Sequence, residues 1–223
     1  TVFVLRGAYG DFAAPVVDLL RGAGLDPTVV LPEELGPYFT RQLADEALIA
    51  QWLRLVDPET FAGLLVDPTL ARAVEAFAER IRSATTVFAD WCDPGAAFAS
   101  LLLPPGARLV IRMHRLDAVR VWPQLTDWSA VAALIVVSEH VRAMVARQIV
   151  RPDASEPTRI VVLNNVIDVA RYRRAKTPGA HRRLAMVGWG RQVKDPIFAL
   201  EILRELLAHD PDWELHLIGR DFP

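Results

Sequence analysis

Three groups of residues in this sequence could do chemistry, and each follows a short apolar run. The first is a histidine, His114, directly after the run at residues 108–113. Imidazole titrates near neutral pH, so such a residue can exchange a proton or a hydrogen bond with a ligand. When His114 is taken alone, a surface-loop histidine is the simpler interpretation.

The other two groups suit an anion. Gly7 and Gly10 form a turn after the first apolar run, where the backbone can approach a ligand and a following helix offers free N–H groups. A plain tight turn explains this pair equally well. Arg191 and Lys194 lie in a glycine-containing loop before Pro196 and could hold a diphosphate beside a helix N-terminus. An ordinary exposed loop is the alternative there.

Alternating strands and helices must position these groups. Apolar runs rich in Val and Ile predict strands at residues 2–6, 28–31, 86–88, 108–113, 133–137, 160–163, 184–187 and 215–218. Helical periodicity predicts helices at residues 12–21, 41–56, 70–83, 96–103, 140–149 and 197–208. The pattern is typical of an α/β protein with a doubly wound, mostly parallel, Rossmann-like sheet. Ligands of such sheets bind at the carboxyl ends of the strands, where all three groups are expected.

The 223 residues are enough for one large domain or for one domain and part of a second. We expect an N-terminal Rossmann-like domain over residues 1–170, with a helical insertion at about 32–83. A basic stretch without an apolar stripe, residues 171–182, predicts a linker. Residues 183–223 would then form the first βαβ unit of a second domain, of which the rest is truncated.

Composition excludes several classes of protein. With 25 Lys and Arg against 27 Asp and Glu, the chain has no basic excess for a nucleic-acid partner. Its single cysteine, Cys92, cannot form a disulfide within the chain, which favours a reducing, cytoplasmic location. No apolar run is long enough for a transmembrane segment.

Four passages carry motifs in a characteristic order: residues 109–117, 134–142, 159–172 and 184–219. Together they resemble the family 4 glycosyltransferases (group 1) of the GT-B type, which consist of two Rossmann-like domains. The resemblance implies that His114 contacts the transferred sugar near its anomeric centre. It also implies that Arg191 and Lys194 bind the donor diphosphate, and that Gly7 and Gly10 belong to the acceptor or phosphate loop. The loop departs from the family pattern, since Trp189 follows Gly188 where the family usually places an arginine.

The family transfers a sugar, with retention of configuration, from a nucleotide-diphosphate-sugar to an acceptor. By resemblance we therefore expect a cytoplasmic hexosyltransferase of bacterial polysaccharide biosynthesis that needs no cofactor and no bound metal. Its partners would be the nucleotide sugar and a carbohydrate or lipid-linked acceptor, with peripheral membrane contact left open. The family's donor-binding glutamates would lie beyond residue 223, so we expect residues 1–223 by themselves to be inactive.

Two other interpretations remain open. The first is a non-catalytic, glycosyltransferase-like binding or scaffold module of a larger polysaccharide-assembly protein. The second is a nicotinamide-dependent Rossmann enzyme, against which the lack of a G-x-G-x-x-G motif after the first predicted strand argues.

Overall fold

The computed structural model describes residues 1–7, 12–31, 68–147, 149, 158–165, 167, 169–190 and 194–219. The chain divides into two compact units, Thr1–Val166 and Ile167–Pro223, and each is considered by itself. The domain and linker boundaries expected from the sequence stay a prediction. Most of the expected helical insertion, residues 32–67, and the helix expected at 41–56 lie outside the described residues.

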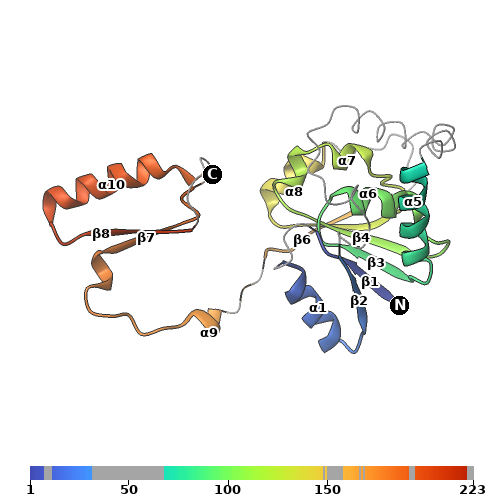
Figure 1. The fold of residues 1–223 in the computed structure, drawn as a ribbon, viewed down its shortest axis with the longest axis horizontal. Helices are drawn as coiled ribbons and strands as arrows, with labels where there is room; N and C mark the ends of the chain where they lie inside the picture. The colour runs from blue at the N-terminus through green and yellow to red at the C-terminus, as the bar shows by residue number, and fades with distance from the viewer. Residues whose placement is uncertain are drawn as a thin grey trace. The chain divides into compact units, whose positions relative to one another are not determined.

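The first unit is built on a six-stranded sheet with the order β2-β1-β3-β4-β5-β6 (Figure 1). All neighbouring strands are parallel. The strands are β1 (Val2–Leu5), β2 (Pro27–Val30), β3 (Thr86–Ala89), β4 (Arg108–Met113), β5 (Val131–Val136) and β6 (Arg159–Val162). Each lies within two residues of the range predicted for it. The prediction of an α/β fold with a parallel sheet is therefore confirmed, and the architecture is consistent with a Rossmann-like fold.

Helices cover both faces of this sheet, because successive side chains of a buried strand point to opposite sides. On one face Val4 of β1 packs with Ala13 and Val17 of α1 (Ala13–Gly22). On the other face Phe3 and Leu5 join the larger core. That core receives side chains from α5 (Pro68–Ile81), α6 (Pro94–Leu102), α7 (Trp122–Leu125) and α8 (Glu139–Val145).

Two helices of this unit begin at polar caps. Ser138 caps α8 by accepting a hydrogen bond from the backbone N–H of Val141 at 3.2 Å. Asp93 caps α6 by accepting from the N–H of Ala96 at 3.2 Å. Pro94 follows as the first residue of the helix, a position where a missing N–H costs nothing. These caps fix where the chain turns from a strand end into a helix.

The second unit contains a short helix α9 (Val169–Tyr172), a 3₁₀ turn η4 (Ala180–Arg182) and one βαβ arrangement. In the latter, β7 (Arg183–Val187) pairs in parallel with β8 (Glu214–Ile218), and α10 (Pro196–His209) connects them. Arg182 forms ion pairs with Asp210 and Asp212. None of the described residues of this unit is fully buried.

No helix within the described part of the chain has both the length and the apolar character needed to cross a bilayer.

Candidate functional site

The strand order brings three chain segments together at the carboxyl ends of neighbouring strands. β1 lies between β2 and β3, so the winding of the chain changes direction there. At such a switch point the connections leave to opposite faces, and a crevice forms at the carboxyl ends of the strands. Gly7 follows β1, Trp91 follows β3 and His114 follows β4. The candidate site is built from what these three strand ends carry.

His114 is buried, with 6% of its surface exposed. Its ring stacks on that of Trp91, with the centroids 4.2 Å apart and the planes inclined by 19°. The ring of Phe12, just before α1, lies 5.0 Å away. The interpretation of His114 as a surface-loop histidine is therefore wrong, because the strand end delivers its ring into an aromatic enclosure.

This enclosure keeps the imidazole neutral. The pKa of His114 is lowered from 6.5 to about 4: burial lowers it most, the positive charge of Arg112 also lowers it, and a hydrogen bond with the Asp90 backbone opposes both effects. The Nε2 atom is buried and has no hydrogen-bond partner among the described residues. A neutral imidazole nitrogen in this state can accept or donate one hydrogen bond to a ligand, and a buried polar atom without a partner favours such a ligand.

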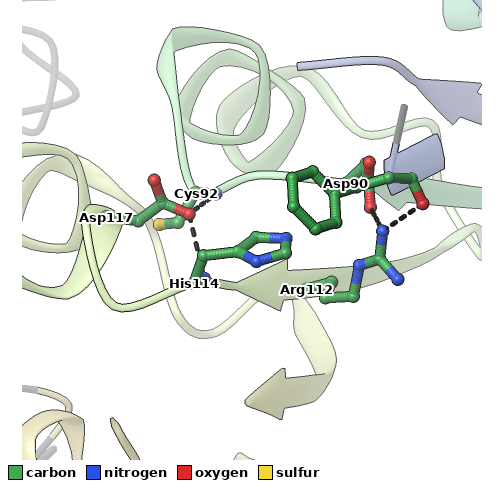
Figure 2. A network of polar contacts seen from close by, with 6 residues as sticks. Asp90, Cys92, Arg112, His114 and Asp117 are labelled. Carbon is green, nitrogen blue, oxygen red and sulfur yellow. Dashed lines mark hydrogen bonds and ion pairs between the residues drawn. The ribbon is translucent and has the colours of Figure 1, made fainter. Parts of the chain in front are cut away.

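Arg112 and Asp90 form a buried ion pair beside His114 (Figure 2). The Asp90 side chain is fully buried, and that of Arg112 is 13% exposed. Arg112 also donates to the backbone carbonyl of Phe12, so it joins β3, β4 and the start of α1. Burial raises the pKa of Asp90 to about 6, although the charge of Arg112 acts in the opposite direction. The pair fixes a positive charge within the site.

Asp117 holds the strand ends from the other side (Figure 2). Its Oδ2 atom accepts hydrogen bonds from the backbone N–H groups of His114 at 3.1 Å and Cys92 at 3.2 Å. Cys92 itself is fully buried. The carboxylate thus connects the loop after β3 with the loop after β4.

Gly7 leaves room for the indole of Trp91. A Cβ atom on Gly7 would lie 2.1 Å from Cδ1 of Trp91, far inside van der Waals contact. The residue type at this position is therefore explained by packing against Trp91. The expected role of Gly7 in an acceptor or phosphate loop stays a prediction, and Gly10 lies outside the described residues.

Of the pair expected to bind a diphosphate, the structure describes Lys194. It belongs to the second unit, is exposed and directly precedes the cap of α10. That cap is Asp195, whose side chain accepts from the N–H of Phe198 at 3.1 Å. Asp195 also takes a left-handed backbone conformation, with φ at 53°. Arg191 lies outside the described residues.

Four residues of the site are not predicted from the sequence: Asp90, Trp91, Arg112 and Asp117. Asp90 and Trp91 come two and three residues after the strand predicted at 86–88, so the rule that led to His114 would also have found them. Arg112 and Asp117 flank His114 in the passage that carries the family resemblance, but their partners come from β3. Those partners become visible only when the strand order is known.

Comparisons with known proteins do not assign the site. In the described part of the chain, no group of three or more His, Cys, Asp or Glu side chains could hold a metal ion. The chain matches no model of a known protein family and no curated protein sequence. The glycosyltransferase resemblance is therefore carried by the sequence motifs and stays a prediction.

Proposed function

We propose that the chain belongs to a retaining glycosyltransferase of the GT-B type, in which the first unit is the acceptor-side domain. The observation that carries the proposal is the buried, neutral His114 with an unpartnered Nε2 at the carboxyl end of β4, next to the switch point of a parallel sheet. The order of the motifs along the sequence indicates a second domain, which in this proposal binds a nucleotide-diphosphate-sugar.

The chemistry of His114 supports this role. A sugar hydroxyl beside the anomeric carbon can exchange a hydrogen bond with Nε2, which would orient the ring for transfer. The anomeric carbon gains positive charge in glycosyl transfer. A neutral imidazole adds no charge repulsion at that point, unlike an imidazolium. The burial that lowers the pKa of His114 therefore serves the reaction.

The leaving group of this reaction is a nucleotide diphosphate. In the proposal Arg191 and Lys194 neutralise its developing negative charge, so that no cofactor and no metal ion is required. Gly7 and Gly10 belong to the acceptor or phosphate loop, and the acceptor is a carbohydrate or a lipid-linked carbohydrate. The proposed setting is bacterial polysaccharide biosynthesis in the cytoplasm, with peripheral membrane contact where the acceptor is lipid-linked.

Sugar transfer by the complete gene product tests the role of His114. We expect His114→Ala to lower kcat by about 10- to 100-fold, the range for loss of one hydrogen bond made in the transition state. The readout is release of nucleotide diphosphate from a panel of nucleotide sugars, with the anomeric configuration of the product determined by NMR. A transferase that keeps its kcat without His114 contradicts the assigned site.

Nucleotide binding tests the second half of the proposal. Lys194→Ala should raise the Kd for the nucleotide diphosphate by about tenfold, because one charge-assisted contact is lost. Lys176→Ala is the matched control, since these are the chain's two lysines and Lys176 lies in the expected linker. Equal Kd values for both variants remove Lys194 from the site. A gene product that binds nucleotide sugar but transfers nothing favours the non-catalytic scaffold.

A further inference from the structure

Asp117 makes an unusual set of contacts for a residue three positions after His114. Its side chain is buried, with 3% of the residue exposed. A single oxygen, Oδ2, accepts from the N–H of His114 at 3.1 Å and from the N–H of Cys92 at 3.2 Å. Its own backbone N–H donates to the carbonyl of His114 at 3.1 Å, and that of Ala118 donates to the same oxygen at 3.3 Å. The backbone of His114 is thus held on both its N–H and its C=O side.

The second acceptor contact extends this hold to β3. Cys92 directly follows Trp91, whose indole is the stacking partner of the His114 ring. The same carboxylate oxygen therefore fixes the backbone beside each of the two stacked side chains. A loss of this oxygen would remove one hydrogen bond from each of the two strand ends, and so loosen the placement of both stacked rings.

We propose that Asp117 is a positioning residue, which holds His114 and Trp91 in register through one shared acceptor oxygen. The inference rests on the proposed function only for the task that His114 performs once it is positioned. The positioning role of Asp117 requires an acceptor atom at the place of Oδ2 and does not require a negative charge there.

Two observations support action through geometry. The influences on the pKa of His114 are burial, the charge of Arg112 and the backbone of Asp90, and the carboxylate of Asp117 is not among them. Burial also raises the pKa of Asp117 to about 7, so this group exists partly as a neutral acid at neutral pH. An asparagine, which is neutral and has one carbonyl oxygen, should therefore replace it well.

Titration of His114 by NMR in the full 223-residue chain tests the inference without any substrate. His114→Gln assigns its signal among the five histidines. In Asp117→Ala we expect the pKa of His114 to rise by about one unit or more towards its ordinary value, because the ring gains access to water. In Asp117→Asn we expect it to stay within about half a unit of the native value.

Asp117→Glu and Asp93→Ala complete the set. Glutamate keeps the charge but moves the oxygen by one methylene, so it should behave like alanine, and it replaces the alanine variant if that one does not fold. Asp93→Ala removes a neighbouring carboxylate that caps α6 and does not contact the backbone of His114; it should leave the titration of His114 unchanged. An unchanged titration in folded Asp117→Ala or Asp117→Glu overturns the inference. A shift in Asp117→Asn as large as that in Asp117→Glu overturns it as well.

Activity of the complete gene product provides a second, separate readout. We expect Asp117→Ala to lower kcat by about tenfold or more with little change in the KM for the nucleotide sugar, and Asp117→Asn to restore kcat. A smaller folded fraction would also lower the apparent kcat at unchanged KM, so kcat is calculated per folded molecule, with the folded fraction of each variant measured by circular dichroism. If the titrations behave as expected but no sugar is transferred by the native protein, the proposed function fails and the positioning role of Asp117 stands.

Discussion

At the scale of single residues, the site depends on the contact between the His114 and Trp91 rings. The stacking with Trp91 removes water from the imidazole and keeps it neutral. Trp91 can occupy its place because Gly7 has no side chain. The site therefore depends on three strand ends at once: Gly7 after β1 makes room for Trp91 after β3, and Trp91 covers His114 after β4. A change at Gly7 should therefore be felt at His114, although the two lie 107 positions apart in the sequence.

Gly7→Ala should destabilise the protein by about 1–3 kcal/mol, the usual cost of overpacking a filled site. Because the added methyl group must displace Trp91, the pKa of His114 should rise as well. Denaturant unfolding measures the first effect and NMR titration the second. The matched control is Gly22→Ala, whose Cβ meets nothing within 4 Å in α1. Equal unfolding free energies for both variants would contradict the packing role of Gly7.

At the scale of elements, a carboxyl group with a raised pKa stands at the start of α6 and another at the start of the 3₁₀ turn η3 (Asp117–Val119). Burial raises the pKa of Asp93 from 3.8 to about 7, and backbone hydrogen bonds from α6 reduce this shift. The folded protein therefore holds the proton more tightly than the unfolded chain does. Between about pH 4 and pH 7 the unfolded chain has released it, so the free energy of unfolding falls as the pH rises.

Asp93→Asn should remove this dependence on pH, because the amide keeps the cap but does not titrate. Relative to the variant, the native protein should lose up to about 1 kcal/mol of unfolding free energy per pH unit between pH 4 and 7. Denaturant unfolding at several pH values measures the difference. Ser138→Ala, which removes a cap that does not titrate, should lower stability by about 1 kcal/mol at every pH. Parallel profiles for the native protein and Asp93→Asn would rule out the titration of Asp93 as the cause.

The positions of the strands could be predicted from the sequence better than the order in which they lie side by side in the sheet. Buried parallel strands are short apolar runs bounded by Gly, Pro and Asp, and the first six could be located to within two residues. His114 was found because it follows such a run. The ion pair of Asp90 with Arg112 and the contact between Gly7 and Trp91 depend on which strands are adjacent. Strand order is decided by three-dimensional packing and leaves no periodic signal in the sequence.

At the scale of the whole molecule, the two units differ in how they are stabilised. The first has a continuous apolar core on one face of the sheet and a smaller core on the other. In the described residues of the second, large apolar side chains of α10 such as Ile197 and Phe198 are 65% and 57% exposed. The hydrophobic contribution to folding is proportional to the apolar area removed from water. The first unit therefore contributes most of the free energy of unfolding of the 223-residue chain.

A polypeptide of residues 1–166 should consequently fold by itself. Its thermal midpoint should lie within about 5 °C of that of the 223-residue chain, a shift equivalent to roughly 1–2 kcal/mol for a domain of this size. The pKa of His114 should not change, because the rings of Trp91 and Phe12 that bury it and the charge of Arg112 all belong to the same unit. Circular dichroism and NMR titration provide the two measurements. Loss of cooperative unfolding in the shorter polypeptide would show that the first unit depends on the second.

The burial of the Cys92 thiol determines how fast an alkylating reagent can label it. Its Sγ atom lies 3.8 Å from Oγ1 of Thr126, the residue is fully buried, and burial raises the thiol pKa well above its ordinary value. An alkylating reagent can therefore reach the sulfur only while the segment after β3 is open. Cys92 is the only cysteine of the sequence, so every alkylation event reports this one opening. The labelling rate therefore reports how readily the segment after β3 opens, either locally or with the whole unit.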